Sequence, residues 1–319
     1  MTDILTSIHG RRFGLGGPGQ LILDGVLIHP VPNPTGAKDY YVDGNISTSK
    51  SGDDWENPLD TLAEAIALSN TSIALTANRW WARRNRIFIL GDQEFAEDLV
   101  VFPEKCDIIG LGFDVEAMPR IEGEHVIEAL ATGKAYGTRF FNVGFMAGGI
   151  DATIHLTTDH MGVEFWGCKM WPNVAGSTHA IRLANSNRGF KFMNSQIYMG
   201  PGAPGTAIFA EAIKIEGVAQ HDMIIKGNYI HGTEGIHAVA AAACYNGLIQ
   251  DNVIYATDLT INDVSDKMTV TNNKLFTEAD PTAALTGAIV ANDAISANNR
   301  VSSTAGTERN APYPPEVIS

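Results

Sequence analysis

One short pattern recurs along the sequence between residues 86 and 303. Apolar anchor residues return every 21 to 33 positions, and three places before each anchor stands Gly, Asn or Asp. These residue types adopt a positive φ at low cost. Five places before the anchor, the residue is apolar in every repeat except the last. The pattern predicts a strand, a one-residue left-handed bend and a second strand, repeated once per turn of a coil.

The columns of this repeat assign expected roles to individual residues. The anchors are Phe113, Phe145, Met170, Ile197, Ile230, Ile254, Leu275 and Val301. The expected bend residues are Gly110, Asn142, Gly167, Asn194, Gly227, Asp251, Asn272 and Asn298. Two places before the last four anchors the sequence has Asn228, Asn252, Asn273 and Asn299. If successive turns stack at the spacing of strands in a sheet, about 4.8 Å, these four amides form a hydrogen-bonded ladder.

Asparagine ladders and Gly/Asn bends of this kind resemble those of the right-handed parallel β-helix proteins, the pectate-lyase-like superfold. The stretch from Tyr40 to Asn45, with that from Gly52 to Leu62, is similar to the entry segment of many such proteins. In those proteins, a short strand and an amphipathic helix cover the open end of the coil. The resemblance implies an all-β fold, a right-handed parallel β-helix solenoid with a small helical N-terminal cap and extended terminal arms.

Composition divides the chain into four segments. Residues 1–37 are expected to form an extended N-terminal anchoring arm, and the alternative is an ordinary N-terminal strand packed on the domain. Residues 38–85 form the cap segment, residues 86–303 the β-helix, and residues 304–319 an extended C-terminal tail. Within the cap segment, residues 58–68 predict a helix. Its buried face is expected to hold Leu59, Leu62, Ala63 and Ile66.

Composition also excludes several classes of protein. The net charge is −14, from 22 Lys and Arg against 36 Asp and Glu, which argues against non-specific nucleic-acid binding. A hydrophobic fraction of 45% excludes a disordered chain. No apolar run is long enough to span a membrane, and no secretory signal is visible. Three distant cysteines favour neither disulfides nor a cysteine zinc site. The aromatic and basic run from Trp80 to Arg86 is interpreted as cations at a helix end.

No catalytic, cofactor or metal site is predicted. Six places before successive anchors stand Arg139, Glu164 and Lys191, which favour a surface ion-pair ladder over the calcium and base of a lyase. Paired aspartates of a galacturonase and a nucleophile elbow are both missing from the sequence. Asp43 to Asp54 begins like a calcium loop but has Thr48 where Gly is required, so a turn is expected. The nine histidines are expected to be isolated surface residues.

The leading hypothesis is a non-catalytic virion surface protein of a tailed phage: a capsid decoration, head fibre or spike. Residues 6–15 resemble the N-terminal segment of some tailed-phage structural proteins. The arm would contact other virion proteins by strand addition and ion pairing. We expect a homo-oligomer, with a trimer favoured, that is assembled in the host cytoplasm. The expected anchoring residues are Ile8, His9, Arg11, Arg12, Phe13 and Leu15.

The alternative is a polysaccharide-degrading or glycan-binding β-helix, either a lyase or a tailspike depolymerase. Aromatic rings stack on sugars, and they also fill contacts between subunits. A host-surface glycan would then be the partner. The candidate glycan or subunit contacts are Trp166, Trp171, Tyr198 and Tyr229.

Overall fold

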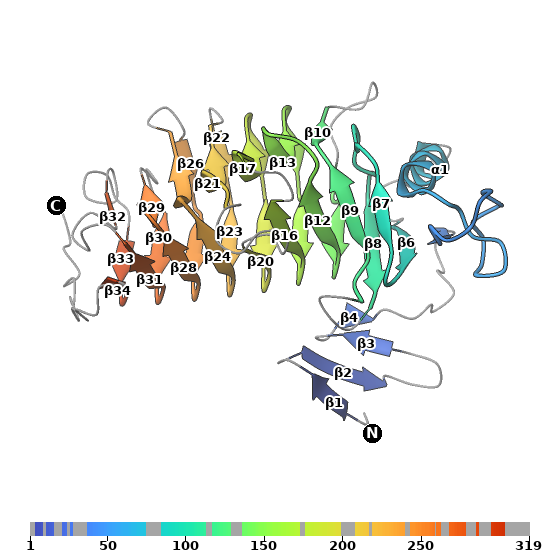
Figure 1. The fold of residues 1–319 in the computed structure, drawn as a ribbon, viewed down its shortest axis with the longest axis horizontal. Coiled ribbons are helices and arrows are strands. Elements are labelled where there is room, and N and C mark those ends of the chain that lie inside the picture. Colours follow the sequence, from blue (N-terminus) through green and yellow to red (C-terminus); the bar gives the residue numbers. More distant parts are fainter. Residues whose placement is uncertain are drawn as a thin grey trace.

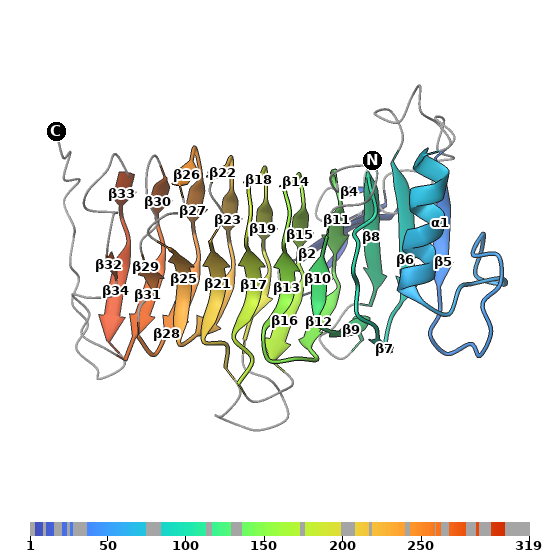
Figure 2. The ribbon, with the colours of Figure 1, turned by 90° about the horizontal axis from the view of Figure 1, so that it is seen from above.

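The computed structural model shows a parallel β-solenoid whose strands stack in rows along one axis (Figure 1). The helix lies at one end of the rows and the strand of residues 300–303 at the other (Figure 2). The structure describes residues 4–8, 11–15, 21–23, 26–27, 37–74, 84–112, 117–128, 136–172, 176–198, 208–216, 219–239, 243–258, 260–262, 268–278, 285–286 and 295–303.

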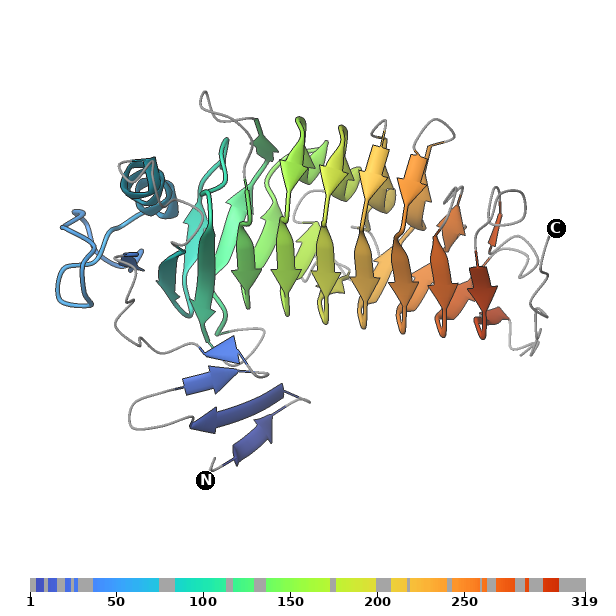
Figure 3. The same ribbon diagram turned by 180° about the vertical axis from the view of Figure 1, so that it is seen from behind.

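Three long parallel sheets form the walls of the coil (Figure 3). The ten-strand sheet contains β5 (Asp39–Val42), β6 (Asn85–Leu90), β8 (Cys106–Leu111), β11 (Arg139–Phe141), β15 (Glu164–Trp166), β19 (Lys191–Met193), β23 (Ile224–Lys226), β27 (Leu248–Gln250), β30 (Thr269–Thr271) and β33 (Ile295–Ala297). The nine-strand sheet contains β7 (Glu94–Ala96), β9 (Arg120–Gly123), β12 (Gly144–Ala147), β16 (Lys169–Pro172), β20 (Gln196–Ile197), β24 (Tyr229–Gly232), β28 (Val253–Ala256), β31 (Lys274–Thr277) and β34 (Arg300–Ser303).

The seven-strand sheet contains β10 (His125–Ile127), β13 (Ala152–Leu156), β17 (His179–Leu183), β21 (Glu211–Ile215), β25 (Glu234–Ala238), β29 (Ile261–Asn262) and β32 (Leu285–Thr286). A shorter parallel sheet lies between it and the ten-strand sheet along the chain, with β14 (His160–Met161), β18 (Asn187–Arg188), β22 (Ala219–His221) and β26 (Ala243–Tyr245). From β8 to β32, each turn of the coil therefore contributes one strand to each of the three long sheets.

The register of the nine-strand sheet confirms the anchors from Phe145 to Val301, since each pairs with the next. The prediction of Phe113 as the first anchor was wrong. Phe145 pairs with Ile121 and not with Phe113, which lies outside the described residues. The connection from β8 to β9 is longer than the one-residue bend of later turns, so counting five places from Ile108 stops short of the strand.

The bend between the ten-strand and nine-strand sheets has a positive φ at seven of the eight expected positions, from Asn142 (55°) to Asn298 (57°). Gly110 is the exception, because it belongs to β8 and has no positive φ. Glycine is required there for a different reason. A Cβ at Gly110 would lie 2.1 Å from the carbonyl oxygen of Asn142, so no side chain fits.

One continuous hydrophobic core fills the coil. In the early turns it is aromatic: Phe140 stacks on Phe165 with ring centroids 5.1 Å apart, and Phe102 and Phe145 pack edge-on against Phe140. In the later turns, the equivalent strand positions hold buried Ile225, Ile249 and Val270. The core therefore changes from stacked rings to aliphatic side chains along the axis.

The helix α1 (Leu62–Ala74) lies beside β5 and β6 (Figure 2). It begins four residues after the predicted start, because Leu59 first bridges to Val42 and Glu97 then accepts the backbone N–H groups of Leu62 and Ala63. Its buried face holds Leu62, Ala65, Ile66, Ser69 and Ile73. Ala63 was therefore misplaced, since it is exposed.

The N-terminal segment contains a separate antiparallel sheet in place of the expected extended arm. Its strands, paired in chain order, are β1 (Ile4–Ile8), β2 (Arg11–Leu15), β3 (Leu21–Leu23) and β4 (Val26–Leu27). Of the expected anchoring residues, Ile8 is in β1, and Arg11, Arg12, Phe13 and Leu15 are in β2. His9 and the expected tail, residues 304–319, lie outside the described residues.

Candidate functional site

The predicted asparagine ladder is present at the buried position that follows the bend, and its role is structural. Asn252 Oδ1 accepts both the backbone N–H and the Nδ2 of Asn228, at 3.0 and 2.9 Å. The same two bonds join Asn252 to Asn273 and Asn273 to Asn299. Ser195 extends the ladder by one turn, because its backbone N–H donates to Asn228 Oδ1. The four asparagines are at most 6% exposed, so the ladder offers no surface for a ligand.

The predicted ion-pair ladder runs along the outside of the ten-strand sheet. In register, it reads Asp39, Arg86, Asp107, Arg139, Glu164 and Lys191. Arg86 binds Asp39 and Arg139 binds Asp107 with two hydrogen bonds each, and Lys191 Nζ lies 2.9 Å from Glu164. Arg84 also binds Asp107. Arg84 and Arg86 were expected at a helix end, but they pair with acids of the sheet, because α1 already ends at Ala74.

The four aromatic candidates do not form one site. Trp166 lies on the ten-strand sheet and stacks against Phe141, at a centroid distance of 6.4 Å. Trp171 is in β16, and Tyr198 directly follows β20. Their ring centroids are 5.6 Å apart, and Trp171 is only 3% exposed. Tyr229 is on the nine-strand sheet, between Gln196 and Val253, with 41% of its surface exposed.

A connected group of nine ionisable side chains lies on the outer face of the seven-strand sheet, where the sequence predicted no site. We call this group the polar network. Strand register places the first residues of β17, β21 and β25 side by side, and three positions further along another row crosses the same strands. Its members are Asp151, His155, His179, Arg182, Glu211, Lys214, Glu216, Glu234 and His237.

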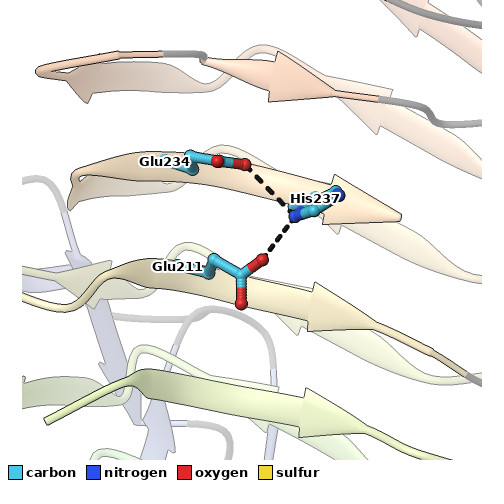
Figure 4. A group of neighbouring side chains, drawn as sticks. All are labelled: Glu211, Glu234 and His237. Atoms are coloured by element: carbon cyan, nitrogen blue, oxygen red, sulfur yellow. Dashed lines mark hydrogen bonds and ion pairs between the residues drawn. The ribbon is translucent and has the colours of Figure 1, made fainter. Parts of the chain in front are cut away.

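Glu211 is the centre of the polar network. Its carboxylate contacts His179 Nδ1 and Lys214 Nζ, both at 3.0 Å, and it also contacts His237 Nδ1. His237 Nδ1 lies 3.2 Å from Glu234 Oε2, so its imidazole lies between two carboxylates (Figure 4). Lys214 and Arg182 both reach Glu216, and Arg182 continues the network to Asp151.

These contacts fix the charge of Glu211. Burial raises the pKa of its carboxyl, but His179, Lys214 and His237 outweigh burial and hold the pKa at about 2. Carboxylate oxygens of Glu211 and Glu234 lie within 4.8 Å of each other, close to the separation of about 5 Å in retaining glycosidases. The imidazole of His237 fills the space between them, so a glycosidic bond has no room there.

The expectation that the histidines are isolated surface residues was wrong. His237 and His179 are in the polar network, and His125 and His160 are buried. Burial lowers the pKa of both His125 and His160 to about 4. Sequence spacing missed the polar network because its residues come from three turns whose connections differ in length. His179, Glu211 and Glu234 follow their preceding anchors by nine, fourteen and four residues respectively.

The remaining small sites agree with their expected roles. Asp43 Oδ1 accepts the backbone N–H of Asn45, which is the predicted self-capping turn. Cys106, Cys168 and Cys244 are free and buried in the core, and burial raises the pKa of the Cys106 thiol.

Among the described residues, no helix is long and apolar enough to cross a membrane. No family model matches the chain, and neither a curated protein nor a solved structure matches it.

Proposed function

We propose that the protein is a non-catalytic structural component of a tailed-phage virion surface, such as a capsid decoration, head fibre or spike. In this proposal the solenoid is a rigid projecting module, and the sheet β1–β4 is its attachment to other virion proteins. We also propose that the coil is right-handed, which is the usual sense of a crossover between parallel strands, and that α1 caps its N-terminal end.

The observation that carries the proposal is the pairing of polar side chains from one turn to the next. Inside the coil, asparagines bond to asparagines. Outside, acids and bases alternate along the ten-strand sheet and form the polar network on the seven-strand sheet. Groups that satisfy one another in this way hold the turns in register. This arrangement supports the interpretation of the solenoid as a stiff rod.

Attachment through the N-terminal sheet is supported by its topology. The strands β1 and β4 are the two edges of the antiparallel sheet, and an edge strand can pair with a strand of another protein. Arg11 and Arg12 lie in β2 beside β1, in a chain of net charge −14. The resemblance of residues 6–15 to phage structural proteins is what suggests a virion as the partner. Assembly in the host cytoplasm and a trimeric state belong to the same proposal.

The decisive experiment is co-sedimentation with particles of the source virus that lack this protein. Full-length protein and a version without residues 1–37 are compared, and circular dichroism verifies that the shortened version keeps its β structure. Binding by the full-length protein alone would support attachment through the N-terminal sheet. If neither version sediments with the particles, the proposed virion role is wrong.

A second candidate function is glycan binding on the outer face of the nine-strand sheet. One row of this face holds Tyr255 and Phe276 at successive turns, with their rings stacked, and Tyr255 also packs on His231. Aromatic faces at successive turns could stack on successive sugars. Binding to a panel of bacterial surface polysaccharides, lost on Tyr229→Ala or Tyr255→Ala, would favour this function, and product release would extend it to a lyase or depolymerase.

A further inference from the structure

The polar network places four metal-ligating side chains together on three successive turns of the coil. His179, Glu211 and Glu234 occupy the same position of β17, β21 and β25. His237 lies three residues after Glu234 on the same strand and points back toward Glu211 (Figure 4). Residues far apart in sequence are therefore held at strand spacing by the backbone ladder, before any ion is considered.

The separations between these groups suit a single small cation. Donor atoms of Glu211, Glu234 and His237 all lie within 4.8 Å of one another. His237 Nδ1 and Glu234 Oε2 are 3.2 Å apart, and His179 Nδ1 and Glu211 Oε2 are 3.0 Å apart. Two ligands of a tetrahedral zinc ion, each about 2.0–2.2 Å from the metal, lie roughly 3.3 Å from each other. Small side-chain movements would therefore bring these atoms to ligand distances.

His179 adds a fourth side chain that could reach the same ion. Its side chain is 8% exposed, and its Nδ1 lies 3.0 Å from Glu211 Oε2. A metal ion bound at the Glu211 carboxylate would therefore lie close to this imidazole nitrogen.

The balance of charge favours a cation as well. The polar network contains four carboxylates, those of Asp151, Glu211, Glu216 and Glu234, against the two cations Arg182 and Lys214. With neutral histidines, two negative charges remain in excess. Lys214 contacts both Glu211 and Glu216, so it keeps the Glu216 partner when a metal ion takes its place at Glu211.

We propose that Glu211, Glu234 and His237, with His179 beside them, bind a divalent transition-metal ion, with Zn²⁺ the preferred ion. A mixed set of imidazole and carboxylate ligands suits zinc better than calcium, which takes six to eight oxygen ligands. The ion replaces the proton that His237 Nδ1 shares with the two carboxylates. It joins β17, β21 and β25, so it acts as a cross-link between three turns of the coil. The site does not depend on the proposed attachment role.

The test is isothermal titration calorimetry of ZnCl₂ into the full chain, prepared without a histidine tag and freed of metal by EDTA and dialysis. We expect one ion per chain and a melting temperature that rises by about 5 °C at an excess of about 100-fold over Kd. His237→Gln should weaken Zn²⁺ binding at least about tenfold. His221→Gln is the matched control, because His221 lies on β22 outside the polar network, and it should bind Zn²⁺ like the wild type.

A second variant keeps the test decisive if His237→Gln does not fold. Glu234→Gln preserves size and shape, and it should reduce both Zn²⁺ affinity and the visible absorption of the Co²⁺ complex. Absence of stoichiometric Zn²⁺ binding by the wild type would overturn the proposal. So would binding that is unchanged in both His237→Gln and Glu234→Gln, because the ion would then sit on other residues.

Discussion

The early and late turns of the solenoid hold the same fold together in different ways. Early turns, around Phe140 and Phe165, fill the coil with stacked aromatic rings, and the position inside the bend is apolar Val143 or Cys168. Late turns, from Asn228 onward, have smaller aliphatic side chains and the asparagine ladder at the bend. The backbone geometry hardly changes. Stacking of like groups along the axis therefore stabilises the coil, whether the groups are rings or amides.

The largest expected effect is in the aromatic part. Phe165→Ala should lower the free energy of unfolding by about 3–5 kcal/mol, because Phe165 is fully buried among Phe140, Phe145 and Phe192 and leaves a cavity. Urea unfolding measures the change. The control Phe276→Ala, on the outer face, should cost far less. An equal loss for Ile249→Ala, at the same position of a later turn, would remove the distinction between the two halves.

Acid should separate the two halves of the coil. His125 and His160 are in early turns with pKa values lowered to about 4, so they stabilise the fold in their neutral form. That stability is present above the unfolded pKa of about 6.5 and is lost as pH falls toward 4, by roughly 3 kcal/mol for each histidine. Glu211 in a later turn, with a pKa of about 2, loses its contribution only below about pH 4.5.

Hydrogen exchange followed by mass spectrometry at pH 7 and pH 5 checks this order. Peptides around His125 and His160 should lose protection at pH 5 while those around Ile249 keep it. The Nδ1 of His125 accepts the backbone N–H of Leu99, so protonation breaks that bond as well. Uniform loss of protection along the coil would contradict the comparison, and His221→Gln should leave the pH profile unchanged.

The ladder of the late turns is the target of the third prediction. Asn252→Leu removes the acceptor of the Asn228 backbone N–H and of its side chain, and the donor to the Ile225 carbonyl. The loss should be about 1–3 kcal/mol, measured by thermal unfolding. Ser195→Ala, where the ladder begins, should cost less, because one hydroxyl is removed. An unchanged melting temperature in Asn252→Leu would show that the buried ladder contributes no net stability.

The smallest effect is expected on the outside of the early turns. Lys191→Met breaks the pair with Glu164, which is partly exposed, so the change in unfolding free energy should be about 0–1 kcal/mol. Urea unfolding at low and high salt measures it, and the wild-type advantage should shrink as salt rises. A loss above 2 kcal/mol that is insensitive to salt would mean that the ion-pair ladder is as important as the core.

The bend between the ten-strand and nine-strand sheets was predictable because it constrains residue type at every turn. A positive φ selects Asn, Asp or Gly, and the buried position beside it accepts an amide only when the next turn supplies another. Even here, the first turn was misjudged, since Phe113 was taken for the anchor that is in fact Ile121. The reason is the longer connection after β8, in which no Gly, Asn or Asp at a fixed spacing marks the start of the next strand.

By itself the sequence determined the strand–bend–strand repeat, the ladder from Asn228 to Asn299 and the paired charges Arg139, Glu164 and Lys191 of the earlier turns. Only the tertiary structure decided the polar network, because Glu211, Glu234 and His179 meet through stacked turns whose connecting loops differ in length. The same holds for the four-stranded sheet at the N-terminus, where short apolar segments predicted no pairing order. Local backbone requirements mark a sequence at fixed spacing. Contacts between turns leave no mark at a fixed spacing, because they depend on the lengths of the connecting loops.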